Sequence, residues 1–134
     1  MITMKELIKD TLISDIIIEH QHNLEELLIR INKIRTAYGK TLTVTSGYRT
    51  IQDHIRIYNK NGIMDPKKIP MQSTHLYGKA VDIYDPNKDL QKWCLANIKI
   101  LEDIGLWLED FEATPNWVHF QISSPKSGKR MFKP

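Results

Sequence analysis

The chain has 134 residues, of which 41% are hydrophobic and 26% charged, and its formal net charge is +3. This length favours one domain (1–134) with a real core, and the composition is that of an ordinary globular protein. The charge is low for a dedicated nucleic-acid-binding protein, so we expect no nucleic-acid partner. The single cysteine, Cys94, excludes both an intramolecular disulfide and a cysteine-based zinc site.

The N-terminal segment lacks the features of a secretory signal, because an acidic residue, Glu6, directly follows the first basic residue, Lys5. The apolar run Leu12–Ile18 is too short and too interrupted to span a bilayer. We therefore expect a protein that is made in the cytoplasm without a signal peptide and has no membrane span. We also expect it to be a monomer.

The first half of the chain is predicted to form two helices with a strand between them. Apolar residues at helical spacing predict a helix that Asn23 caps and Gly39 ends. The alternating segment Thr41–Thr45 predicts a strand. Thr50 is expected to cap a second helix, which runs to about Asn59 and is followed by a loop over residues 60–72. This second helix has an apolar face made by Ile51, Ile55 and Tyr58.

The second half predicts a small sheet. Strands are expected at Ala80–Tyr84, Gly105–Leu108 and Trp117–Ile122, the last two as antiparallel neighbours, with a helix over about Lys88–Ile100. The basic tail, 123–134, is expected to be a solvated terminus, although it would also suit an anionic polymer. The fold class is therefore α+β, with N-terminal helices packed on a small, mainly antiparallel sheet.

Two segments, Ser73–Asp82 and Asn116–Phe120, contain the residues that best suit a metal site. Side chains alternate along a strand, so Asp82 lies opposite the apolar Val81 and Ile83, and His119 lies opposite Val118 and Phe120. Gly78 allows the chain to turn back, which would bring His75 toward Asp82. Two imidazoles and one carboxylate suit Zn²⁺ and leave a fourth position open for water. A single histidine, in contrast, is more often a core or surface residue.

The remaining polar candidates have simpler interpretations. His20 and His22 flank the expected helix start and are expected to be solvated. His54 is expected at the surface, with support of the site from behind as the alternative. Arg49 follows a strand end and suits recognition of a carboxylate or of a developing negative charge, or else forms a surface ion pair.

Three ordered blocks, Ser46–Arg49, Ser73–Asp82 and Trp117–His119, resemble the M15 zinc peptidases, a family of D-alanyl-D-alanine carboxypeptidases, dipeptidases and phage endolysins. The resemblance implies a Hedgehog/DD-peptidase-like fold and zinc bound by His75, Asp82 and His119. It implies a catalytic role for Arg49 at the substrate carbonyl or a nearby carboxylate. It also implies a substrate-binding set of Ser46, Tyr48, Ser73 and Asn116, with support of His75 as the alternative role of Ser73. The substrate would be a peptidoglycan stem peptide, and the compact chain looks most like the phage-type members.

One position departs from the family pattern. Many members have Glu, Asp or His three residues before the last ligand, where this chain has Asn116, which cannot act as a base near neutral pH. We expect Glu112 to serve as the base, with Glu109 as the second candidate. The alternative for each is a solvated acidic residue in a loop with no catalytic role.

The sequence favours two functions over a weaker third, a nucleic-acid-binding domain that would use the basic tail. The first is a zinc-dependent peptidase of the endolysin or D-Ala-D-Ala carboxypeptidase type. It would act on the bacterial cell wall, and a phage-encoded protein of this kind would be released through a holin or carried on a virion. The second is a non-catalytic zinc-binding module of a wall-binding or phage structural protein, which Asn116 favours.

Overall fold

The computed structural model describes all residues from Met1 to Pro134 and has an α+β fold, as predicted. Its helices are α1 (Met4–Ile8), α2 (Ile18–Tyr38), α3 (Ile51–Lys60), α4 (Asp89–Ala96) and α5 (Ile98–Ile104). Its strands are β1 (Val44–Ser46), β2 (Ala80–Tyr84), β3 (Trp107–Glu109), β4 (Trp117–Gln121) and β5 (Met131–Phe132). Short 3₁₀ turns are η1 (Ile13–Asp15), η2 (Pro66–Lys68) and η3 (Thr74–Tyr77). None of the helices combines the length and the apolar character that crossing a bilayer requires.

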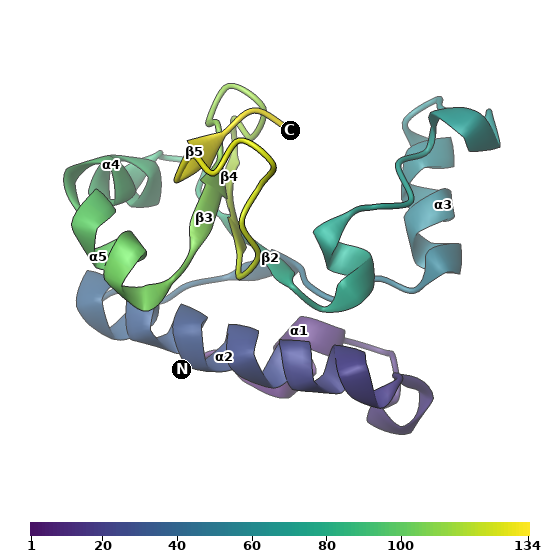
Figure 1. Cartoon of the computed structure of the whole chain (residues 1–134), viewed down its shortest axis with the longest axis horizontal. Coiled ribbons are helices and arrows are strands. Elements are labelled where there is room, and N and C mark those ends of the chain that lie inside the picture. The colour runs from purple at the N-terminus through teal and green to yellow at the C-terminus, as the bar shows by residue number, and fades with distance from the viewer.

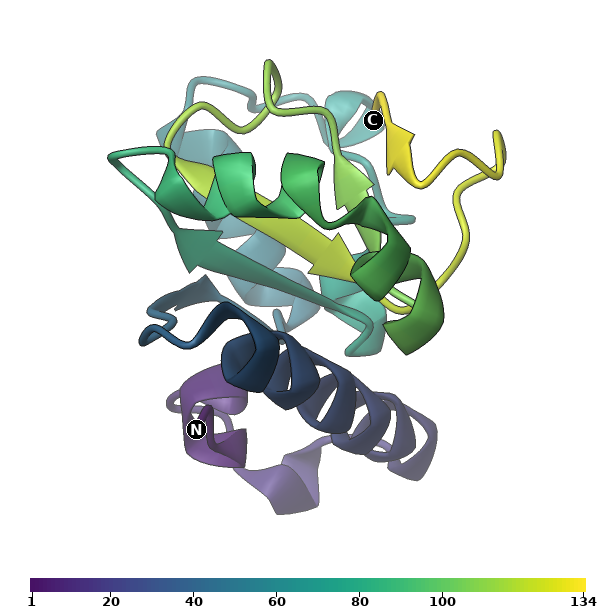
Figure 2. The same cartoon turned by 90° about the vertical axis from the view of Figure 1, so that its left-hand side faces the viewer.

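The five strands form one sheet in the order β1-β2-β4-β3-β5. All neighbouring strands are antiparallel except β3 and β5, which are parallel. Helices α4 and α5 lie on one side of the sheet, and η3 and α3 lie on the other, while α2 runs along its base (Figures 1 and 2). The two faces of the sheet therefore meet different surroundings.

The predicted alternation of core and polar residues along the central strands is confirmed. Val81, Ile83, Val118 and Phe120 are all buried and belong to one hydrophobic cluster of 18 residues that also includes the inner face of α2. Because side chains alternate, the same strands turn Asp82 and His119 toward η3. Packing of one face thus sets the orientation of the other.

Helix α2 starts earlier than predicted, at Ile18, and Asn23 lies inside it rather than at its cap. The side chain of Asn23 instead donates to the backbone oxygen of Tyr77 over 2.9 Å. Burial of Ile16 just before the helix anchors its start without a side-chain cap. Gly39 ends α2 in the left-handed region, with φ of 79°, as expected.

The helix expected over Lys88–Ile100 is two helices, α4 and α5, separated at Asn97. The backbone of Asn97 leaves the helical region, with φ of −131°, and its side chain donates to the oxygen of Trp93. Asparagine competes for backbone hydrogen bonds in this way, which favours a helix end. The sequence pattern is apolar on both sides of Asn97, so periodicity alone did not reveal the break.

Helix α3 has the predicted Thr50 cap, whose hydroxyl accepts from the backbone nitrogen of Asp53. The expected surface position of His54 is wrong, because its side chain is fully buried. One ring nitrogen of His54 lies 2.7 Å from the oxygen of Pro70, whereas Ile51 and Ile55 are exposed. The position of α3 is therefore held by a polar contact between His54 and the loop before Ser73, and not by burial of the predicted isoleucine face.

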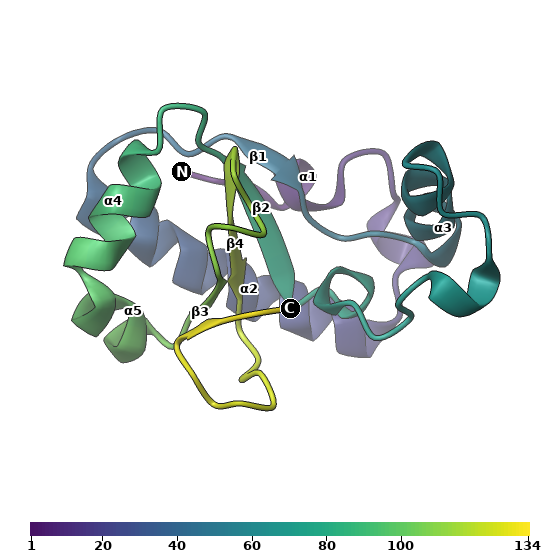
Figure 3. The same ribbon diagram turned by 90° about the horizontal axis from the view of Figure 1, so that it is seen from above.

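The prediction of a solvated tail is wrong for its last part. Strand β5 pairs with β3, and the backbone nitrogen of Asp110 donates to the oxygen of Phe132 over 2.7 Å. The guanidinium of Arg130 lies 4.4 Å from the centre of the Trp107 ring, a favourable cation–π contact. The tail therefore completes the sheet edge, and Figure 3 shows it as a loop that leaves β4 and turns back along β3.

Gly47, next to the end of β1, is required for a close approach between backbones. A Cβ atom at this position would lie 2.3 Å from the backbone oxygen of Leu7 in α1. The next residue, Tyr48, donates its backbone N–H to that same oxygen over 2.8 Å. Only glycine allows this contact, so α1 and the strand end are locked together at Gly47.

We predict that Gly47→Ala destabilises the fold by roughly 2 kcal/mol or more, because backbone atoms must move apart to relieve the overlap. Gly128→Ala is the matched control: its φ is 68° and nothing lies within 4 Å of the added carbon. That control should cost only about 1 kcal/mol, from the left-handed conformation. Urea unfolding measures both, and equal midpoints would contradict the prediction.

Candidate metal centre

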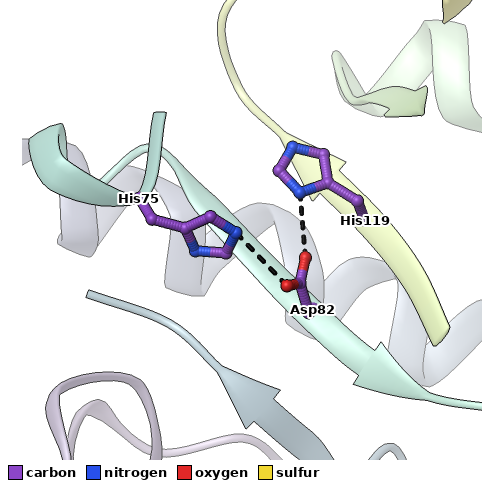
Figure 4. Close-up of side chains that lie close together, drawn as sticks. All are labelled: His75, Asp82 and His119. Carbon is purple, nitrogen blue, oxygen red and sulfur yellow. Dashed lines mark hydrogen bonds and ion pairs between the residues drawn. The ribbon is translucent and has the colours of Figure 1, made fainter. Parts of the chain in front are cut away.

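Three side chains from different elements meet on the polar side of the sheet. Asp82 in β2 and His119 in β4 are direct partners in the antiparallel register. His75 lies in η3, which ends at Gly78 in the left-handed region, with φ of 72°. This turn brings His75 back over β2, as predicted, and Figure 4 shows both imidazoles directed at the Asp82 carboxylate.

The three side chains are in contact through specific atoms. The Nε2 atom of His75 lies 3.3 Å from Oδ2 of Asp82, and the Nδ1 atom of His119 lies 2.8 Å from Oδ1. One possible ligand atom from each residue lies within 4.8 Å of the others, and all three residues are buried. We call this group the His75–Asp82–His119 triad.

The far side of each imidazole also has a partner. Nδ1 of His75 lies 2.8 Å from the backbone oxygen of Gly47, and Nε2 of His119 lies 2.9 Å from Oε1 of Gln121. Both partners are oxygens that only accept, so these two nitrogens carry hydrogen. The opposite nitrogens, Nε2 of His75 and Nδ1 of His119, are therefore the ones able to bind a metal.

Burial and mutual contact shift the pKa values within the triad. Burial lowers the pKa of His75 below its ordinary value. Burial acts in the same direction on His119, but the hydrogen bond and charge of Asp82 outweigh it and raise the pKa of His119. Burial alone would raise the pKa of Asp82, yet the two imidazoles hold it well below its usual range. Asp82 is therefore ionised at neutral pH.

The chemistry of the donor set fits a divalent metal. Neutral imidazole nitrogens and a carboxylate oxygen suit Zn²⁺, and three protein ligands leave one coordination position for water or substrate. A buried carboxylate without a metal needs neighbouring cations, and His119 supplies this charge when protonated. The same residues can therefore hold either a proton or a metal ion.

A cavity of about 480 Å³ opens beside the triad. Elements from both halves of the chain line it, including the loop before η3 and the tail. Its lining residues beyond the triad are Arg49, Tyr58, Pro70, Gln72, Ser73, Thr74, Glu109, Trp117, Gln121, Pro125, Phe132 and Pro134. A cavity of this size accommodates a short peptide segment or a small molecule.

Arg49 lies at the edge of this cavity. Its Nη2 atom is 3.8 Å from Oδ2 of Asp82, and its Nε donates to the hydroxyl of Ser46 over 3.0 Å. The backbone nitrogen of Arg49 also donates to the oxygen of His75. The guanidinium is thus held in place by Ser46, while its terminal nitrogens remain available to a ligand.

The structure separates the other predicted site residues into three groups. Ser73 lines the cavity with the triad, whereas Ser46 and Tyr48 line an adjoining cavity of about 460 Å³ on the other side of Arg49. Asn116 and Glu112 are both exposed and line neither cavity. The carboxylate that does reach the cavity next to the triad is Glu109, the second candidate from the sequence.

Strand pairing explains the position of Glu109. Leu108 in β3 pairs with Phe120 in β4, so the next residue of β3 lies beside His119. Oε1 of Glu109 is 3.6 Å from Nε2 of His119, too long for a hydrogen bond. Its side chain is 22% exposed and therefore keeps contact with water in the cavity.

Several lining residues were not singled out from the sequence. Gln121 lies two residues after His119 and therefore shares its strand face, which is a signal that alternation provides. Phe132, whose ring centre is 6.5 Å from that of His119, comes from the tail and has no such signal. Only the pairing of β5 with β3 places it at the site.

Comparison with known proteins agrees with this geometry. A family model described as peptidase M15 matches residues 1–121 of the chain. The chain belongs to the M15 peptidase family. No curated protein and no solved structure matches the chain significantly. The M15 match includes the whole triad but ends at Gln121, so the tail that contributes Phe132 and Pro134 to the cavity falls outside it.

We predict that zinc affinity of this M15 peptidase increases with pH across the titration of His119. Asp82 raises the pKa of His119, so the metal-free triad holds a proton that zinc must displace. Below that pKa the affinity should fall about tenfold per pH unit, as expected for one displaced proton. Above it the affinity should level off.

Chelator competition at a series of pH values measures this dependence. Calorimetry in two buffers with different ionisation enthalpies would count the released proton directly. Affinity that stays constant from pH values below to above the ordinary imidazole range would contradict the prediction.

Proposed function

We propose that the chain is a zinc-dependent peptidase that hydrolyses peptide bonds in peptidoglycan stem peptides, as an endolysin or a D-Ala-D-Ala carboxypeptidase does. The observation that carries this proposal is the triad at the wall of a cavity, with Arg49 and Glu109 beside it. Membership of the M15 peptidases supports the reaction class. The resemblance of the three sequence blocks supports the cell wall as the place of action.

In this proposal His75, Asp82 and His119 would hold zinc, the two histidines through Nε2 and Nδ1 and Asp82 through a carboxylate oxygen. The chemistry that zinc would supply there is that of a Lewis acid, which would polarise the scissile carbonyl and lower the pKa of a water molecule. The contacts behind the ligands support this arrangement, because Gly47 and Gln121 each accept from the nitrogen that does not face the metal.

Arg49 orients the substrate and stabilises negative charge. Its guanidinium is largely buried, is anchored at Nε by Ser46 and faces the cavity near Asp82. In a partly buried site a hydrogen bond from a guanidinium to an oxygen that gains charge is stronger than one in water. A peptide carbonyl or a nearby carboxylate is the group that such a donor recognises.

Glu109 is the proton-transfer group in this proposal. It lies in the cavity within reach of a water molecule beside the triad, and its carboxylate makes no hydrogen bond to His119. Glu109 accepts a proton from the attacking water and passes it to the leaving amine. Glu112 was the first choice from the sequence, but its exposed side chain does not line the cavity.

Removal of a triad residue should abolish both zinc binding and turnover. We expect His75→Ala, Asp82→Ala and His119→Ala to retain no stoichiometric zinc and to cleave no purified muropeptide, because two ligands do not hold the metal. His22→Ala, which changes an exposed residue of α2, is the matched control and should behave like the parent. Metal analysis and mass spectrometry of muropeptides measure the two effects, and cleavage by a zinc-free His119→Ala protein would disprove the assignment.

Replacement of the two candidate bases should separate their roles. We expect Glu109→Gln to lower kcat by about 10²–10⁴-fold, the usual contribution of a general base, with little change in zinc content. Glu112→Gln is the matched control and should leave kcat within about twofold of the parent, since an exposed loop acid contributes little. The reverse pattern would assign the proton transfer to Glu112.

The same muropeptide experiment tests the alternative of a non-catalytic zinc-binding module. Stoichiometric zinc with no released amine or D-alanine would support a module that binds the cell wall without cutting it. The products would also distinguish a carboxypeptidase, which releases a terminal amino acid, from an endopeptidase, which releases a peptide.

A further inference from the structure

Gln121 is a buried amide with a fixed orientation directly behind the triad. It follows His119 by two residues in β4 and is only 5% exposed. Its Nε2 atom donates to the backbone oxygen of Ser123 over 2.8 Å. A flipped amide would place two acceptor oxygens against each other at that point, so the contact with Ser123 fixes which end of the amide faces inward.

The inward oxygen of Gln121 has two neighbours that can donate to it. Nε2 of His119 lies 2.9 Å from this oxygen, and the hydroxyl of Thr74 donates to it over 3.3 Å. Thr74 immediately precedes His75 in η3, whereas His119 lies in β4. One amide therefore connects the backbone segments that carry two of the three triad residues.

We propose that Gln121 is a positioning residue that keeps the hydrogen of His119 on Nε2, so that Nδ1 is the nitrogen presented to a metal. Without this acceptor Nε2 has no hydrogen-bond partner, since Glu109 is 3.6 Å away, and the ring can reorient to bind metal through Nε2 instead of Nδ1. The inference rests on the proposed metal site, but it concerns the orientation of the ligand rather than the substrate.

The position of Gln121 has a second consequence for Glu109. Both side chains approach Nε2 of His119, but the amide oxygen lies at 2.9 Å and the carboxylate at 3.6 Å. Because Gln121 accepts the hydrogen, Glu109 keeps its lone pairs for water.

Three variants test the proposal. Gln121→Met removes the acceptor while retaining a similar volume. Gln121→Glu retains an oxygen that can accept from Nε2–H, but it loses the donor to Ser123. Gln91→Met is the matched control, because Gln91 is also buried, 6% exposed, and donates to the backbone oxygen of Thr114 away from the triad. Loss of a buried amide hydrogen bond destabilises both methionine variants, so stability alone does not distinguish them.

The first measurement is nitrogen NMR of the histidine rings in the zinc-loaded and cadmium-loaded proteins. In the parent we expect cadmium coupling to Nδ1 of His119 and an Nε2 hydrogen that exchanges slowly with water. Gln121→Met should give fast exchange or mixed coordination, whereas Gln91→Met should retain the parent spectrum. A Gln121→Met spectrum identical to that of the parent would overturn the proposal.

The second measurement is zinc affinity by chelator competition. We expect Gln121→Met to weaken binding about 10–100-fold, the usual effect of losing a partner behind a histidine ligand, and Gln121→Glu to restore it to within a few-fold. Parent-like affinity in Gln121→Met, or equal weakening in Gln91→Met, would also overturn the proposal. These readouts need no turnover, so a protein that binds zinc without cleaving peptide would contradict the proposed function alone.

Discussion

The antiparallel pairing of β2 with β4 is the interaction on which the rest of this structure depends. It places Asp82 opposite His119, and on the other face it brings Val81, Ile83, Val118 and Phe120 into the core. A shift of one residue would turn the whole core face outward and would separate the carboxylate from the imidazole. The hydrophobic effect that stabilises the fold therefore also fixes the register of the candidate metal centre.

Every nitrogen of the triad has a defined oxygen partner, and these partners come from separate parts of the chain. Gly47 connects the site to α1, Gln121 connects it to Ser123, and Asp82 joins both imidazoles at the centre. Charge is balanced in the same small volume, because burial disfavours ionisation while Asp82 favours a proton on His119. Such a site is organised before a metal arrives, which reduces the cost of binding it.

The sequence predicted the triad, the strands β2 and β4, the Gly39 helix end and the Thr50 cap, because each depends on local spacing or on one residue type. It was wrong about the surface position of His54 and the solvated tail, and it placed one helix across Asn97. Those features depend on contacts over long separations, such as His54 with Pro70 and β5 with β3. The position of Glu109 beside His119 is a contact of the same kind, because it follows from the pairing of β3 with β4 and not from proximity along the chain.

The sequence by itself determined the ligand types, their order and the strand faces on which they lie, because alternation and glycine turns are properties of the local backbone. Only the tertiary structure decided which carboxylate reaches the cavity, which nitrogen of each histidine faces inward, and that the tail forms part of the wall. These outcomes depend on packing and on hydrogen bonds between segments that are far apart in the chain. Such contacts cannot be inferred from any single stretch of sequence.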